Sequence, residues 1–445
     1  MKRFLHILSV LVTLTSITFT LSAQQQETSK QTIIANLRQE LTKTKSAKDS
    51  IIILYDIFDL SRQREKVSVG NEILKTASHI GDVRTKLDIY RQLTSSYHDD
   101  NDFLKLIKAV KKLPDSREKK ETLTFLEMKR LSFSSKFTPE SERQRAIAKL
   151  IADEPQDKKG NDDDATEKLM ALYTLVEYLR NEAPGEMLEK YLDKLVKQVN
   201  SESFELYALP NTVYSEAANI YSDAGDATRA IEADRKLLEV IDGLDAKYKA
   251  QGREFRDYAR NRYVVYRRMM RNYKGLKPGD ADDLMEKARQ LAEIDADVKA
   301  DLELQPRMKA YYNMATGNYA EAIPYIKRLL DKDTETTSYN GNAVRRQLLE
   351  MLVTAAEKTG DDQTRIKALT EYNAMLNEYE DLKASQRYKE LQIKYDIADL
   401  KEQNSQLELE AKDSKIKSMR RSMILELTAF GIVVVVLVFF LLYWS

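Results

Sequence analysis

Apolar side chains recur three and four positions apart along most of the chain. From Thr28 to about Glu371 they form one short stripe after another, and the first of these contains Ile33, Ile34, Leu37 and Leu41. Such spacing is typical of amphipathic helices, because one helical turn takes 3.6 residues. The breaks between stripes are short and polar. The pattern therefore predicts an all-α chain whose antiparallel helical hairpins bury these stripes against one another.

The clearest interruption is the segment DEPQDKKGNDDDA, from Asp153 to Ala165. It contains Pro155, Gly160 and a run of charges, which together are typical of a linker. We therefore expect a region of helical hairpins over residues 24–155 and a second helical region over residues 162–362. The three consecutive aspartates lack the ligand spacing of an EF-hand, so helix capping and solvation explain them better than calcium.

A turn with the same neighbours recurs along the chain. A glycine followed by Asp or Asn is flanked by small and aromatic residues, first as Ala218, Tyr221, Gly225, Asp226 and Ala230, and again as Ala310, Tyr312, Gly317, Asn318, Tyr319 and Ala322. Looser copies surround Gly360 and Gly81. Glycine permits the tight turn, and small residues let two helices approach closely. These residues are predicted to form the turns and the packing contacts of a helical repeat.

This repeat resembles the tetratricopeptide repeat (TPR) family. The resemblance implies an α-solenoid of helical hairpins with a concave face that binds a protein or peptide partner. The looser copies depart from the pattern, because they lack the alanine that follows the turn.

No Gly or Pro occurs from Asp361 to Phe430, so this segment can form one helix of roughly 105 Å. Part of it has heptad spacing, at Ile393, Ile397, Leu400, Asn404 and Leu407. Asn404 at an a position favours a parallel dimer. Residues 363–421 are therefore predicted to form a stalk that pairs with a second copy. The alternative is a single amphipathic helix that caps the last repeat.

Both ends of the chain carry apolar runs. Residues 1–23 have a basic start, an apolar stretch and a small residue, Ala23, where cleavage would fall, which is typical of a secretory signal peptide. An uncleaved anchor is the alternative. Residues 424–444 are long and apolar enough for a transmembrane helix, with Tyr443 and Trp444 at the position of an interfacial belt. A buried core helix is the alternative there.

The segment that leads into this run, RYKELQIKYDIADLKEQNSQLELEAKDSKIK, is similar to the connector of Gram-negative TPR sensor proteins. That resemblance implies a bacterial inner-membrane protein with its body in the periplasm and a cytoplasmic output, either a histidine kinase or a LuxR-type helix-turn-helix domain. The chain itself holds no such output. The basic residues between Lys412 and Arg421 oppose the positive-inside tendency, and this predicts that the native chain continues past Ser445.

Composition excludes several kinds of chemistry. The chain has 71 basic and 71 acidic residues, no Cys and three His. It therefore lacks disulfides, thiolate metal sites and cysteine nucleophiles, and it has no phosphate-binding glycine motif or serine-nucleophile motif. We expect no enzyme activity, no catalytic residue, no metal and no cofactor. The zero net charge gives no reason to expect nucleic-acid binding.

One stretch is unusually rich in arginine. The residues Arg253, Arg256, Arg260, Arg267 and Arg271 lie at helical spacing. If they faced a groove, their guanidinium groups could bind carboxylates of a peptide or an anionic glycan. If they faced outward, they would pair with acids of neighbouring helices, which is the favoured interpretation.

The function predicted from these features is that of a membrane-anchored periplasmic TPR protein, the sensory or partner-binding module of a transmembrane signalling system. The alternative is a TPR scaffold that organises envelope proteins without signalling.

Overall fold

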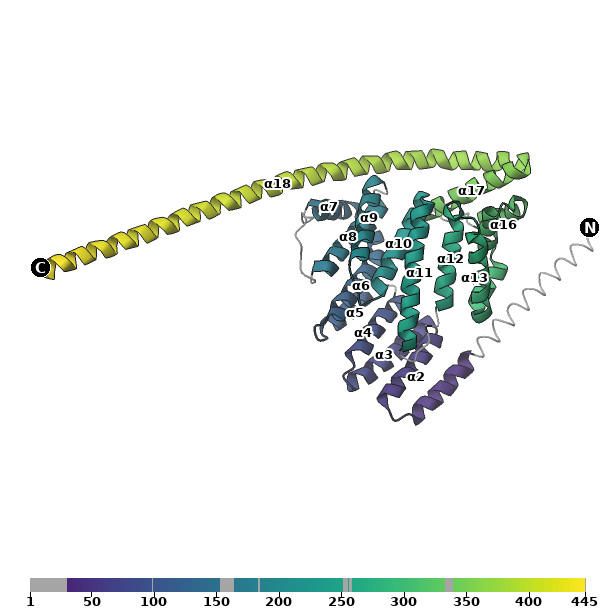
Figure 1. Ribbon diagram of the computed structural model, residues 1–445, viewed down its shortest axis with the longest axis horizontal. Helices are drawn as coiled ribbons and strands as arrows, with labels where there is room; N and C mark the ends of the chain where they lie inside the picture. Colours follow the sequence, from purple (N-terminus) through teal and green to yellow (C-terminus); the bar gives the residue numbers. More distant parts are fainter. Residues whose placement is uncertain are drawn as a thin grey trace, which may run out of the picture. The chain divides into compact units, whose positions relative to one another are not determined.

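The computed structural model describes residues 30–97, 99–152, 164–182, 185–250, 255, 258–332 and 339–444. Within these ranges every regular element is a helix and there is no strand, which confirms the all-α class (Figure 1). The predicted signal peptide and most of the predicted linker lie outside the described residues.

A helix over residues 30–43 precedes the labelled elements. The next group is α2 (Ala47–Leu60), α3 (Gln63–His79), α4 (Val83–Leu93), α5 (Asp100–Lys111), α6 (Arg117–Ser134), α7 (Glu140–Ala152), α8 (Asp164–Glu182) and α9 (Glu186–Ser201). There follow α10 (Ala208–Ala224), α11 (Ala227–Ala250), α12 (Tyr258–Arg271), α13 (Asp280–Ile294), α14 (Ala296–Leu304), α15 (Pro306–Ala315), α16 (Tyr319–Lys332), α17 (Tyr339–Thr359) and α18 (Asp362–Trp444). Three short 3-10 helices also occur, at Thr94–Ser96, Ser135–Phe137 and Tyr273–Gly275.

The helices form two compact units. Among the described residues, the first unit comprises 30–137, 164–177 and 190–382, and the second comprises 138–152, 178–182, 185–189 and 383–444. Both units contain residues from either side of the predicted linker at 153–165, and the predicted domain bounds stay predictions.

In the first unit, helices that are consecutive in the chain pack together. Such pairs include α2 with α3, α5 with α6, α10 with α11, and α15 with α16. The core contains Ile57, Ile73, Leu87 and Ile89, which are all buried, whereas Ile33 of the first predicted stripe is exposed and Ile34, Leu37 and Leu41 are half-buried. Burial of these apolar faces stabilises helices that would be marginal alone. This arrangement is compatible with the helical repeats predicted from the sequence.

The repeated turn has the same geometry in four places. Gly81, Gly225, Gly317 and Gly360 all have positive φ, from 70° to 86°, which a glycine adopts without strain. In each turn, the following residue donates its N–H to the carbonyl five positions back, in the pairs Asp82 to Ala77, Asp226 to Tyr221, Asn318 to Asn313 and Asp361 to Ala356, at 2.8 to 2.9 Å. This hydrogen bond defines a Schellman motif, which closes the first helix of each hairpin.

The aspartate of the turn begins the second helix. Asp82, Asp226 and Asp361 each accept a hydrogen bond from the N–H three residues on, at 2.9 to 3.0 Å. The Gly-Asp pair therefore ends one helix and caps the next. The small residues Ala218, Ala230 and Ala322 and the ring of Tyr221 are buried, and Tyr319 is half-buried, at the positions the repeat predicts.

We expect the substitution Gly225→Ala to lower the free energy of unfolding by about 1–2 kcal/mol, because a Cβ disfavours the left-handed conformation. No heavy atom lies within 4 Å of the position that Cβ would take, so the cost is purely conformational. Gly225→Asn is the control, since Asn tolerates this conformation better. Urea titration of both variants provides the measurement, and equal losses in the two would contradict a conformational cause.

The second unit contains α7, the end of α8, the start of α9 and α18 from residue 383. Lys389 of α18 forms ion pairs with Glu140 at 2.8 Å and Glu182 at 3.5 Å, and Arg143 also pairs with Glu182. The side chains of Ile393 and Ile397 are 0% and 9% exposed. These two residues of the predicted stalk register are therefore buried within their own chain, and pairing with a second copy stays a prediction.

The other predicted register positions differ in side-chain exposure. Leu400 is half-buried, whereas Asn404 and Leu407 are exposed. The predicted unbroken helix is present, because α18 runs from Asp362 to Trp444 without interruption.

The predicted transmembrane segment, residues 424–444, forms the end of α18. The side chains at 429–436 and 438–445 lie outside the described residues. In the part of the chain that the structure describes, no helix is both long and apolar enough to cross a membrane. The transmembrane segment therefore stays a prediction.

Candidate partner-binding groove

A groove of about 740 Å³ opens in the first unit. Its lining comes from α2, α3, α4, α6, α10, α11 and α12, from the 3-10 helix Thr94–Ser96, and from Leu206, Tyr207 and Phe255. Pockets of about 300–1,000 Å³ are the usual size for ligand sites. The repeat resemblance predicts a concave binding surface, and this groove is the candidate for it.

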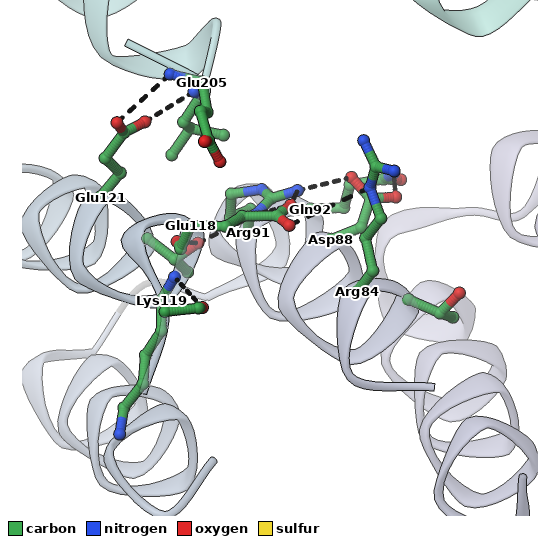
Figure 2. Close-up of polar contacts among 12 residues, drawn as sticks. Arg84, Asp88, Arg91, Gln92, Glu118, Lys119, Glu121 and Glu205 are labelled. Atoms are coloured by element: carbon green, nitrogen blue, oxygen red, sulfur yellow. Dashed lines mark hydrogen bonds and ion pairs between the residues drawn. The ribbon is translucent and has the colours of Figure 1, made fainter. Parts of the chain in front are cut away.

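Arg91 lies at the centre of a polar network in the groove lining. We call this network the floor, and it comprises Asp88, Arg91, Gln92 and Glu118. The Arg91 side chain is only 10% exposed, and its guanidinium lies 3.2 Å from Asp88 and 3.4 Å from Glu118 (Figure 2). Nη1 also donates to Thr122 Oγ1 at 2.9 Å. Because a planar guanidinium offers five donors in a rigid fork, one side chain can tie α4 to α6.

Asp88 is the second centre of this network. It accepts hydrogen bonds from the Tyr55 hydroxyl at 2.7 Å and from Gln92 Nε2 at 2.9 Å. Gln92 Nε2 also lies 3.5 Å from the hydroxyl of Tyr248, so a polar contact joins α4 to α11. These contacts fix the floor before any ligand arrives, which reduces the entropy lost on binding.

Glu121 accepts hydrogen bonds from the backbone of the loop that precedes α10. Its buried carboxylate accepts hydrogen bonds from the backbone N–H groups of Glu205 at 3.2 Å and Leu206 at 2.7 Å (Figure 2). Arg117 Nε donates to the same carboxylate at 3.0 Å. A buried carboxylate is costly unless it is paired in this way. The contact positions Leu206, which lines the groove.

The groove lining carries five basic and four acidic side chains, and three of the basic ones form no ion pair among the described residues. Among its acids, Asp82, Asp88 and Glu118 all bind groups of the same chain, and Asp59 also has an interaction within the chain. Among its bases, Lys48, Lys66 and Lys247 form no ion pair among the described residues. The unpaired amines are therefore available to an anionic ligand.

Aromatic rings lie beside these lysines. Lys66 Nζ stands 5.2 Å from the centroid of the Phe58 ring, and Lys247 Nζ stands 5.3 Å from that of Tyr207. The rings of Tyr248 and Phe255 are 5.3 Å apart on the α11 side. A ligand that combines acidic and apolar groups would match both the charge and the rings.

The arginines singled out in the sequence lie elsewhere. Arg260 pairs with Asp297, Arg267 lies 3.1 Å from Asp301, and Arg271 lies 3.1 Å from Asp223. These three described arginines thus bind acids of α10 and α14 within the chain. Arg253 and Arg256 lie outside the described residues. As a partner-binding surface, the arginine stripe stays a prediction.

Sequence reasoning missed the groove residues. Lys48, Arg91, Glu118 and Lys247 come from four helices far apart in the chain, and they share no motif or spacing. No local signal distinguishes these lysines from the many that solvate a helix face.

Among the described residues, no group of three His, Asp or Glu side chains could hold a metal ion. Comparison with protein-family models gives no match, and no curated protein is significantly similar to the chain.

Proposed function

We propose that this chain is a TPR-like partner-binding protein whose groove takes a peptide segment that combines acidic and apolar side chains. The observation that carries the proposal is the charge imbalance of the groove. Its acids are engaged within the chain, whereas Lys48, Lys66 and Lys247 have no acidic partner among the described residues. The aromatic rings would add apolar contact area, and the preformed polar network would reduce the entropy lost on binding.

Within the wider proposal, the chain is exported, anchored by its apolar segment at 424–444, and placed with its body in the periplasm. Occupation of the groove would change the packing of the first unit and so the position of α18, which continues from the repeats to residue 444. These statements rest on the sequence patterns and on the resemblance to TPR sensor proteins. A scaffold that binds envelope proteins without signalling would use the same groove.

A charge-reversal experiment tests the groove. The probe is a fluorescein-labelled twelve-residue peptide that alternates Glu with Leu and Phe, and the protein is the full chain. We expect the double substitution Lys66→Glu and Lys247→Glu to weaken binding about tenfold or more, which corresponds to about 1.4 kcal/mol. Fluorescence anisotropy at two salt concentrations gives the affinity, and binding should weaken as salt rises.

The matched control is Lys108→Glu with Lys111→Glu, which changes the net charge equally on exposed positions of α5 outside the groove. This control should bind the peptide like the unaltered chain. Equal weakening in both double variants would show a general charge effect, and tight binding of a Lys-for-Glu peptide would exclude acidic recognition.

A further inference from the structure

Three aromatic side chains of the groove lining gather around the last two turns of α11. Tyr207 packs directly on Gly243 of this helix, since a Cβ added to Gly243 would lie 2.7 Å from Tyr207 Cε1. Tyr248 belongs to the helix itself, and the ring centroid of Phe255 lies 5.3 Å from that of Tyr248. We call Tyr207, Tyr248 and Phe255 the aromatic cluster. All three line the groove and are half-buried, so part of each side chain is open to a ligand.

Contacts behind the groove lining hold the Phe255 ring. The ring centroid of Tyr258 lies 6.3 Å from that of Phe255, with the two rings edge to face. Tyr258 in turn donates its hydroxyl to Asp242 Oδ1 at 3.0 Å. The guanidinium of Arg262 lies 5.3 Å from the centroid of the Tyr258 ring and pairs with Asp242. A ring that is fixed in this way loses little conformational freedom when a ligand binds.

The other two rings of the cluster are also held in place. The buried carboxylate of Glu121 accepts the N–H of Leu206 at 2.7 Å, which fixes the backbone next to Tyr207. The hydroxyl of Tyr248 lies 3.5 Å from Gln92 Nε2. The aromatic cluster is therefore preformed in the absence of a ligand.

An amine without an acidic partner lies beside this cluster. Lys247 Nζ stands 5.3 Å from the centroid of the Tyr207 ring, and it forms no ion pair among the described residues. Aromatic rings in tilted or offset contact attract each other more than their buried area alone accounts for. A ligand ring is therefore favoured here over an aliphatic side chain of the same size, and an acid next to that ring can pair with the amine.

We propose that the aromatic cluster is a subsite for one aromatic side chain of the partner peptide, and that Lys247 pairs with an Asp or Glu next to that residue. This assignment rests on the proposed function of the groove. It narrows the partner from any acidic and apolar segment to one in which an acid adjoins a Phe or Tyr.

Two labelled peptides test the ring subsite in the full chain. Both are twelve residues long and alternate Glu with Leu, and the central Leu is replaced by Phe in one and by cyclohexylalanine in the other. Cyclohexylalanine resembles Phe in size but has no π system. By fluorescence anisotropy, the unaltered chain should bind the Phe peptide about fivefold more tightly than the cyclohexylalanine peptide. Phe255→Leu should remove this preference and retain the affinity for the cyclohexylalanine peptide.

Phe137→Leu is the matched control, because Phe137 is 75% exposed and lies outside the groove lining. This variant should keep the preference for the Phe peptide. Equal affinity of the unaltered chain for the two peptides, or a preference that survives Phe255→Leu, would overturn the aromatic subsite while the acidic groove stands. Failure of both peptides to bind would overturn the proposed function together with the subsite.

A double-mutant cycle tests the acid independently of the ring. Each Glu beside the Phe is changed to Gln in a separate peptide, and both peptides are measured against the unaltered chain and Lys247→Gln. At one of the two positions, either change alone should weaken binding about threefold and the two together no further, because they remove the same ion pair. Lys66→Gln is the control, and its loss should add to that of the same peptide change. Additive losses for Lys247→Gln at both positions would overturn its pairing with the acid beside the ring.

Discussion

The substitution Arg268→Met should lower the free energy of unfolding by about 3–5 kcal/mol, because it leaves a buried carboxylate without its counterion. Arg268 of α12 is 10% exposed and pairs with Asp234 of α11, which is 0% exposed. Its Nη1 also donates to Asn219 of α10 at 2.9 Å, so one side chain joins three helices. Chemical denaturation at pH 8 is the measurement.

The loss should depend on pH. Burial raises the pKa of the Asp234 carboxyl to about 6, although the guanidinium of Arg268 lowers it. Removal of the arginine would raise this pKa further. Between the unfolded value of about 4 and the folded value, only the folded state holds the proton, so stability falls as pH rises. The variant should therefore lose less relative to the unaltered chain at pH 5 than at pH 8.

Arg260→Met is the matched control, because it removes an arginine from the same helix. Arg260 and its partner Asp297 are 50% and 52% exposed. Exposed ion pairs contribute less than about 1 kcal/mol, so this variant should be nearly as stable as the unaltered chain. Similar losses in the two variants would mean that helix propensity, and not burial of the charge, sets the cost.

Replacement of Ile57 by alanine should cost about 2–5 kcal/mol in the free energy of unfolding. Ile57 lies on α2 and is 0% exposed, so truncation removes buried apolar area and leaves a cavity. The same helix carries Tyr55, whose hydroxyl binds Asp88 in the floor of the groove. Thermal and urea unfolding of the full chain give the size of the loss.

Ile52→Ala is the comparison for this core substitution. Ile52 belongs to the same helix but is 47% exposed at the groove. Its truncation should change stability by about 0.5 kcal/mol or less, as is usual for surface positions. A loss at Ile52 as large as at Ile57 would show that α2 is stabilised by something other than its buried face.

The positions of helices and turns followed from the sequence because they depend on near neighbours. Helical periodicity predicted the helices, and the Gly-Asp pairs at Gly81, Gly225 and Gly360 predicted turns whose hydrogen bonds span five residues. The helix from Asp362 onward was expected from the absence of Gly and Pro, and it is present as α18. Local rules of this kind need no knowledge of the tertiary fold.

Heptad spacing in α18 illustrates where such rules stop. Two stripes with coiled-coil spacing share this helix, and the sequence favoured the one that contains Ile393 and Ile397. The structure buries both residues inside the chain and exposes Tyr388, Leu391 and Tyr395 instead. Spacing shows that a face can pack, but it does not show whether the chain itself or another molecule covers that face.

What the sequence determined by itself is thus the helical class, the order of the hairpins and the chemistry of their turns. Only the tertiary structure shows which residues line the groove and which charged residues are paired within the chain. Lys66 and Lys247 line one groove although 181 positions separate them in the chain, whereas Arg260, Arg267 and Arg271 are paired with acids of other helices. The physical reason is that a charge is available to a partner only where folding brings no opposite charge to it.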